Sequence, residues 1–140
     1  MKKINYIFIF VFYLILSSLS AEISYFQKGK NLFSEKKYDQ AKFKFEQDLV
    51  LNPKNESSYL YLAKIFKLKN DDNQEESNLK TVILLNPKNE EAIYHLALLK
   101  IRKSNYSETK KLLENFKKNC QNLCQKSSEL KDKLSNITKK

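Results

Sequence analysis

The hexapeptide Leu-Asn-Pro-Lys-Asn-Glu occurs at Leu51–Glu56 and again at Leu85–Glu90, so its two copies start 34 residues apart. Recurrence at this spacing is typical of chains built from stacked helix–turn–helix units. One such unit cannot bury its own apolar face, and neighbouring units must therefore stack to form a common core. The hexapeptide thus predicts an all-helical stack.

The first 20 residues have the features of a targeting segment. Lys2 and Lys3 precede an apolar run at Ile4–Leu16, and small residues follow up to Ala21. This order is typical of a secretory signal peptide that is removed before Ala21. An uncleaved anchor is the alternative, because the 18 uncharged residues from Ile4 to Ala21 are at the short limit for a bilayer span. Both interpretations predict an exported protein, either periplasmic or secreted, or anchored in the inner membrane.

The remaining sequence divides into three rows of equal length and a short remainder, at 22–55, 56–89, 90–123 and 124–140. Apolar residues recur in the rows at steps of three and four, which predicts helices almost throughout. In the first row the small residues Gly29 and Ala41 mark a point where two antiparallel helices cross closely. Pro53 ends the second of these helices, because the residue before a proline is driven out of the helical conformation.

The residue types in the three rows resemble the tetratricopeptide repeat. That family places a bulky, a small and an aromatic or aliphatic residue on the first helix of each repeat. An aromatic, a small and another aromatic residue follow on the second helix, before a closing proline. The residues that carry the resemblance are Tyr25, Gly29, Leu32, Tyr38, Ala41, Phe45 and Pro53 in the first row, Tyr59, Ala63, Phe66, Leu79, Val82 and Pro87 in the second, and Ile93, Ala97, Tyr106, Leu113 and Phe116 in the third.

The resemblance implies an all-α fold in which residues 22–123 form three repeats in a short right-handed superhelical stack. In the remainder, 124–140, Leu130, Leu134 and Ile137 recur with helical spacing among polar residues. This pattern predicts an amphipathic capping helix with a basic tail, because the open end of a repeat stack needs a cover with one polar face.

Five residues depart from the family's pattern, and one of them is Lys28, which replaces an apolar residue in the first helix of the first row. Asp72 and Glu75 replace an aromatic and a small residue in the second row. We therefore expect a looser turn at 70–73 and a shifted or splayed second helix in that repeat. In the third row Lys100 occupies an apolar position and Gln121 replaces the closing proline. Without that proline, the last helix is expected to run on or to end irregularly.

The sequence contains no recognisable catalytic or cofactor motif. The single histidine, His95, lies beside core positions of a predicted helix, and the single glycine, Gly29, is a packing residue. A phosphate-binding loop needs several glycines. A calcium loop needs spaced oxygen ligands and a terminal Glu, which the run Asp71-Asp72-Asn73 lacks. We therefore predict no enzyme activity, no cofactor and no metal site.

Cys120 and Cys124 are the only cysteines. In an exported protein, a pair at this spacing suggests a disulfide. The geometry is poor within a straight helix but favourable across a helix end, where the bridge would pin the capping helix to the third repeat. The alternatives are free or buried thiols and, less favoured, metal or redox chemistry, because zinc needs more ligands than these two.

The resemblance implies that the first helix of each repeat lines a concave face. The residues at matching positions are Phe26, Lys30 and Phe33, then Leu60, Lys64 and Lys67, then Tyr94, Leu98 and Ile101. Apolar anchors beside lysines suit an extended or helical peptide with apolar side chains and some negative charge. The alternative is that the capping helix, or a second copy of the protein in a homo-oligomer, covers several of these apolar residues.

One specialised form of this groove is not expected. The family's carboxylate clamp binds the C termini of chaperones through Lys, Asn and Arg side chains, at positions that here are Phe26, Lys30, Tyr61, Glu91 and His95. We therefore predict a non-enzymatic adaptor or assembly factor of the cell envelope that binds a protein or peptide partner through other contacts.

The net charge of +10 is unevenly distributed along the chain. Residues 21–99 carry 12 lysines and 12 acidic residues, whereas residues 100–140 carry 12 basic and 4 acidic residues. Solvated helix faces are the simple interpretation. The alternative function is that a basic patch binds an anionic membrane or cell-wall surface, and nucleic acid is not favoured as a partner. That patch would consist of Lys103, Lys110, Lys111, Lys117 and Lys118.

Overall fold

The computed structural model of the chain describes residues 24–138. The predicted signal or anchor segment, at 1–20, lies outside these residues. The described part contains seven helices and no strand. In chain order they are α2 (Tyr25–Ser34), α3 (Tyr38–Leu51), α4 (Glu56–Leu68), α5 (Asp72–Leu85), α6 (Glu90–Arg102), α7 (Tyr106–Asn119) and α8 (Lys126–Thr138).

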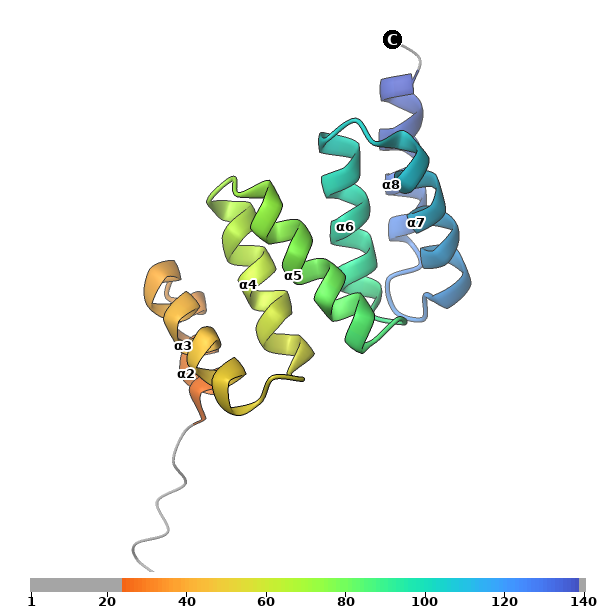
Figure 1. The fold of residues 1–140 in the computed structure, drawn as a ribbon. Coiled ribbons are helices and arrows are strands. Elements are labelled where there is room, and N and C mark those ends of the chain that lie inside the picture. Colours follow the sequence, from red (N-terminus) through yellow and green to blue (C-terminus); the bar gives the residue numbers. More distant parts are fainter. Residues whose placement is uncertain (1–23, 139–140) are drawn as a thin grey trace, which may run out of the picture.

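The helices form three antiparallel pairs, α2 with α3, α4 with α5 and α6 with α7, which follow one another across the molecule (Figure 1). The second helices of the pairs begin at Tyr38, Asp72 and Tyr106, so the starting positions are 34 residues apart. The 34-residue spacing therefore continues into the third repeat, although that repeat does not end in a copy of the hexapeptide. The all-helical repeat stack expected from the sequence is confirmed.

The asparagines of the hexapeptide start the next repeat. Asn55 Oδ1 accepts a hydrogen bond from the Ser57 backbone N–H at 3.1 Å, and Asn89 Oδ1 accepts one from Ala92 at 2.9 Å. Each bond satisfies a donor in the first turn of a helix. In the first copy, the buried carboxylate of Asp48 also accepts from Asn55 Nδ2 at 2.6 Å. These local bonds explain why the same short sequence starts a helix twice.

The turn at 70–73 is not looser than the others, contrary to the expectation from Asp72 and Glu75. Lys36, Asn70 and Ser104 occupy the same position in the three repeats, and all have positive φ, at 61°, 56° and 56°. The second repeat therefore makes the same turn as the first and the third. Asp71 caps α5 by accepting from the Gln74 N–H at 3.1 Å.

Helix α7 ends in register, although Gln121 replaces the closing proline. It stops at Asn119, the position that corresponds to the last residue of α3 and of α5. The Glu90 carboxylate accepts hydrogen bonds from the backbone N–H groups of Asn122 at 3.0 Å and Leu123 at 2.7 Å. These bonds fix the chain beyond α7 in a non-helical path, and so the expected overrun does not occur.

In the first repeat, helices α2 and α3 pack closely where a small residue lies between them. A Cβ atom added to Gly29 would lie 2.7 Å from Phe45 Cε1, and so only glycine allows α2 to approach α3 this closely. At the other end of the stack, α8 packs against α6 and α7 and buries Leu130 and Leu134. The predicted capping helix is thus part of the core.

No helix within residues 24–138 combines the length and apolarity needed to cross a bilayer.

Candidate functional site

The residues predicted to line the concave face begin on α2 and α4. Phe26, Lys30 and Phe33 on α2 are half-buried, as are Lys64 and Lys67 on α4. Each of these side chains therefore retains some exposed surface. Leu60, the sixth residue predicted on these two helices, is buried in the core of the second repeat. The first two repeats thus present the greater part of the predicted groove.

The third repeat contributes less than predicted. Tyr94 and Ile101 are only 9% and 8% exposed, because they pack in one cluster with Leu130 of α8. The Tyr94 hydroxyl also donates to Glu129 Oε1 on α8 at 2.9 Å. Leu98 is half-buried beside the same cluster. The prediction that Tyr94 and Ile101 line an open groove is therefore wrong, since the capping helix covers them.

Tyr61 organises the aromatic part of the site. Its ring stacks on Phe45 with 4.9 Å between centroids, and the edges of Phe33 and Phe26 approach it at 5.1 Å and 5.9 Å. The Lys64 ammonium lies 4.8 Å from the centre of the same ring. Sequence reasoning used Tyr61 only to reject the carboxylate clamp. Its position directly after Leu60, on the predicted groove helix, was the signal that it could belong to the site.

A chain of charged groups crosses from α4 to α6. Lys64 Nζ lies 2.7 Å from Glu91 Oε1, and His95 Nε2 lies 3.7 Å from the same oxygen. Interaction with His95 and Lys64 outweighs the effect of burial and lowers the pKa of Glu91 to about 2. Glu91 is therefore ionised at neutral pH and holds Lys64 across the interface between the second and third repeats.

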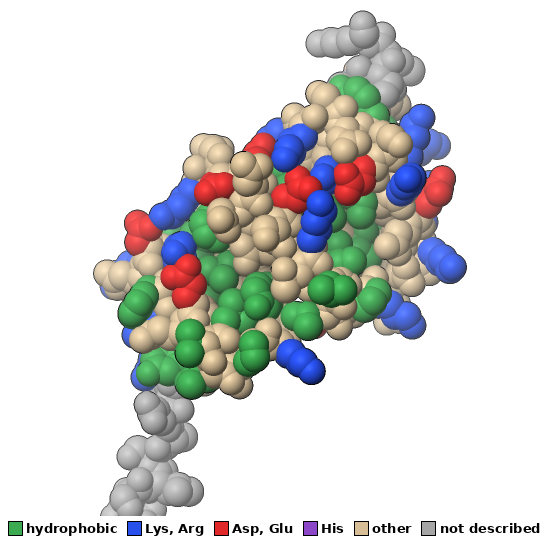
Figure 2. All heavy atoms as spheres, in the orientation of Figure 1, with side chains coloured by type: hydrophobic (Ala, Val, Ile, Leu, Met, Phe, Trp, Pro, Cys, Tyr) green, Lys and Arg blue, Asp and Glu red, His purple; other side chains and the backbone are tan. Residues whose placement is uncertain are grey.

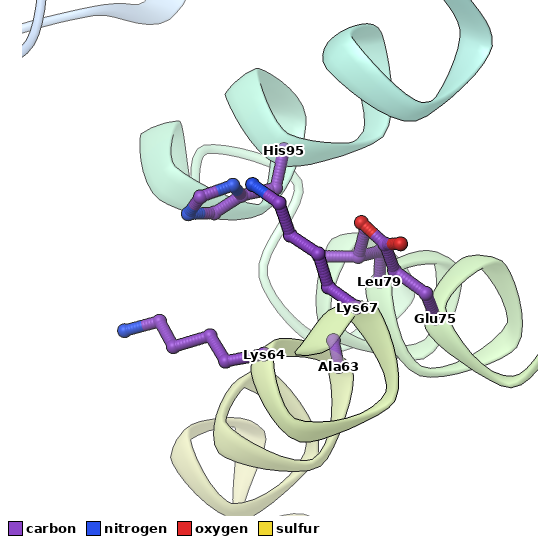
Figure 3. Close-up of a pocket in the computed structure, with 6 residues that line it drawn as sticks. All are labelled: Ala63, Lys64, Lys67, Glu75, Leu79 and His95. Carbon is purple, nitrogen blue, oxygen red and sulfur yellow. The ribbon is translucent and has the colours of Figure 1, made fainter. Parts of the chain in front are cut away.

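Figure 3 shows a small cavity between these helices, with Lys67 and His95 projecting toward each other from α4 and α6. Its volume of about 10 Å³ is enough for one water molecule at most. This cavity is therefore too small to hold a ligand larger than water. The residues that line the cavity are Ala63, Lys64, Lys67, Glu75, Leu79 and His95.

A second ion-pair network joins the second and third repeats. The buried Lys100 lies 2.6 Å from Glu76 and 2.9 Å from Glu108. Arg102 lies 2.5 Å from the buried Glu75 and 2.7 Å from Asp72. Glu75 and Lys100, two of the departures from the family's pattern, are therefore accommodated by charged partners.

The network makes stability depend on pH through Glu76. Hydrogen bonds from Lys100, Lys80 and Lys103 lower its pKa from 4.5 to about 2. The ionised carboxylate thus contributes fully to stability above pH 4.5, and the contribution is lost as the pH falls toward 2. We expect Glu76→Gln to lower the free energy of unfolding by about 2 kcal/mol at pH 7, and by much less near pH 2. Urea unfolding at both pH values measures this difference.

The matched control is Glu114→Gln, at an exposed position on α7 that has no ion pair among the described residues. Its stability should follow that of the wild type at both pH values. A Glu76→Gln effect of equal size at the two pH values would contradict a charge-based contribution.

The predicted basic patch is exposed on α7 and the turn before it. Lys103 lies 3.1 Å from Glu76 and so belongs to the network between the repeats. Lys110, Lys111, Lys117 and Lys118 form no ion pair within residues 24–138. These four lysines therefore remain available to an anionic surface.

Cys120 and Cys124 form a disulfide directly after α7, with 5.2 Å between their Cα atoms. The bridge spans the end of that helix and the connection to α8. Among the described residues no group of three or more His, Cys, Asp or Glu is arranged to hold a metal ion.

The sequence matches no protein-family model and no curated protein. Solved structures match the fold. The first TPR domain of Spaghetti (RPAP3), bound to the HSP90 peptide SRMEEVD, has a TM-score of 0.73 and 20% identity, over 83% of this chain and 91% of that one. The TPR2B domain of yeast Sti1, in a pHsp70 complex, has a TM-score of 0.71 and 15% identity, over 78% of this chain and 91% of that one. The Sgt2 TPR domain from Aspergillus fumigatus has a TM-score of 0.69 and 16% identity, over 83% of this chain and 80% of that one. This chain therefore has the tetratricopeptide-repeat fold.

Proposed function

We propose that this chain is an exported, non-enzymatic adaptor or assembly factor that binds a segment of a partner protein on its concave face. The observation that carries the proposal is the strip of aromatic rings and lysines on α2 and α4, from Phe26 and Lys30 to Phe33, Lys64 and Lys67. Two domains of the same fold are described with bound chaperone segments, from HSP90 and Hsp70.

The ligand should differ from a chaperone C terminus. Where the carboxylate clamp requires Lys and Arg in the third repeat, this chain has Glu91 and His95, and Glu91 is paired with Lys64. Lys30 and Lys67 have no carboxylate partner within the described residues. An internal peptide with apolar side chains and a few acidic residues therefore fits this face best, because rings provide apolar contact and free ammonium groups provide charge.

The test is capture of the partner by crosslinking in cells. We expect Lys30→Glu plus Lys67→Glu to reduce capture at least about tenfold, because like charges then face the acidic ligand. The matched control, Lys110→Glu plus Lys111→Glu, makes the same charge change on α7 and should leave capture unchanged. Loss of the same partner only in the α7 variant would contradict binding on the concave face.

The alternative function is binding of an anionic membrane or cell-wall surface through α7. It is favoured by one observation, the four α7 lysines that lack ion pairs among the described residues. Such binding should collapse as salt shortens the Debye length below about 8 Å, whereas apolar contacts on the concave face should persist. Sedimentation with anionic vesicles at low and high salt separates the two proposals.

A further inference from the structure

A covalent ring lies between the end of α7 and the start of α8. Cys120 and Cys124 are joined by the disulfide, and we call them and the three residues between them the disulfide ring. Two backbone N–H groups inside the ring, those of Asn122 and Leu123, donate to the Glu90 carboxylate at 3.0 Å and 2.7 Å. Glu90 is the first residue of α6. The ring is therefore anchored to the beginning of the helix that α8 covers.

The disulfide ring also determines where α8 begins. The Lys126 N–H, at the first position of α8, donates to the Leu123 carbonyl oxygen at 2.8 Å. With α8 in this position, Glu129 accepts a hydrogen bond from the Tyr94 hydroxyl at 2.9 Å, and the Lys126 ammonium lies 5.6 Å from the centre of the Tyr94 ring. The ring thus places α8 where its first turns reach Tyr94.

Few side chains hold α8 on the third repeat. Among the α8 side chains that the structure describes, only Leu130 and Leu134 are buried. Lys131, Asp132 and Lys133 are exposed. A helix of 13 residues is marginal in water by itself, so α8 stays ordered only while it is docked. A restraint at its first turn therefore has a large influence on whether it stays docked.

The effect of the bridge should be local. On the chain-entropy model, a disulfide stabilises a fold more as the closed loop becomes longer. Cys120 and Cys124 are only four positions apart, and both lie outside the helices of the three repeats. The bridge thus acts mainly on the path of the chain into α8.

The bridge is also accessible to a reductant. Cys124 is exposed and Cys120 is half-buried. Lys117 and Lys118 lie in the last turn of α7, directly before the bridge. Figure 2 shows further lysine side chains along the right-hand border of the molecule, where α7 lies in Figure 1. Positive charge on this side attracts an anionic attacking group such as a thiolate.

A dithiol reduces such a bridge in two exchange steps. One thiolate of the dithiol attacks Sγ of Cys124, the Sγ–Sγ bond breaks, and Cys120 leaves as a thiolate that takes up a proton. The second thiolate of the dithiol then attacks the mixed disulfide. Cys124 leaves as a thiolate and is protonated in turn, and the dithiol becomes a disulfide. Two electrons have passed to the cysteine pair, and the ring is an open chain.

We propose that the Cys120–Cys124 bridge is a redox-controlled latch for α8. In the oxidised chain the disulfide ring holds α8 over Tyr94 and Ile101. Reduction by a dithiol, such as that of a thiol–disulfide oxidoreductase, releases α8 and exposes both side chains on α6. The latch is defined by the docking of α8 alone, and so it does not depend on the function proposed for the concave face.

The test is amide hydrogen exchange of the full chain, with the bridge intact and after reduction by dithiothreitol. We expect the α8 amides to exchange at least about tenfold faster in the reduced chain, whereas those of α2 to α5 keep their rates. Reoxidation should restore slow exchange. Hydroxyl-radical oxidation of Tyr94, measured relative to the half-buried Tyr61 on α4, should rise on reduction, because only Tyr94 is covered by α8.

The control variant is Cys120→Ser plus Cys124→Ser. Its α8 amides should exchange fast with and without dithiothreitol, which shows that the reagent acts through the bridge. Unchanged exchange of α8 in fully reduced wild-type chain would overturn the proposal, because packing alone would then hold the helix. Equal acceleration in all seven described helices would overturn it too, since the bridge would then support the whole stack. So would a bridge that dithiothreitol does not reduce in the folded chain.

Discussion

Arg102→Ala is expected to lower the free energy of unfolding by about 3 kcal/mol, because it leaves a buried carboxylate without its cation. Glu75 is only 1% exposed, and its ion pair is with Arg102 at 2.5 Å. The Arg102 side chain is itself 42% exposed and reaches the Glu75 carboxylate, whose side chain is only 2% exposed, from the surface. Urea unfolding followed by circular dichroism measures the loss.

A double-mutant cycle identifies the cause. Glu75→Ala alone should cost about 1 kcal/mol or less, because the equivalent residues Ala41 and Thr109 show that a small side chain fits this position. Adding Glu75→Ala to Arg102→Ala should recover most of the lost stability. A double variant no more stable than Arg102→Ala would show that Arg102 acts through its packing instead of its charge.

The helical register was predictable because its determinants are local. Asn55 and Asn89 cap the helices that follow them, and Pro53 and Pro87 stand just beyond the helices that precede them. Each signal acts within a few residues of its own position. The repetition of these signals in the hexapeptide therefore defined two boundaries directly, and the third followed from the spacing.

The ion pairs that compensate for the departures from the family's pattern could not be predicted from residue spacing. Lys100 pairs with Glu76, and Arg102 pairs with Glu75, between residues 24 and 27 positions apart on different helices. No periodic pattern selects these pairs, because each involves a residue that breaks the pattern of its own repeat. The sequence showed that Glu75 and Lys100 were unusual, and it did not show which partners would satisfy them.

Only part of the candidate site could be predicted, because its burial also depends on contacts between residues far apart in the sequence. Phe26, Phe33 and Lys64 could be placed on the concave face from helix periodicity and the family resemblance. The burial of Tyr94 depends on the docking of α8, whose Glu129 accepts a hydrogen bond from a residue 35 positions earlier. The spacing of Leu130 and Leu134 predicted that α8 is amphipathic, but it did not specify which face of the third repeat this helix covers.

Leu130→Ala is expected to lower the free energy of unfolding by about 2–5 kcal/mol, the range for removing a leucine side chain from a packed core. Leu130 is fully buried among Tyr94, Ile101 and Phe116. The variant leaves a cavity between α8 and the third repeat, since the disulfide before α8 limits how far this helix can shift to fill it. Urea unfolding measures the total loss, and amide hydrogen exchange shows whether α8 opens first.

The matched control is Lys131→Ala, the next residue of α8, which is exposed and should change stability by no more than about 0.5 kcal/mol. Equal effects of the two substitutions would mean that α8 is not part of the core.

The end helix of a repeat stack can open before the rest, because it contacts neighbours on one side only. If α8 opens in this way, Tyr94 and Ile101 become exposed beside Leu98. The concave face would then extend onto α6, and the capping helix would set how much of the predicted groove a partner can reach.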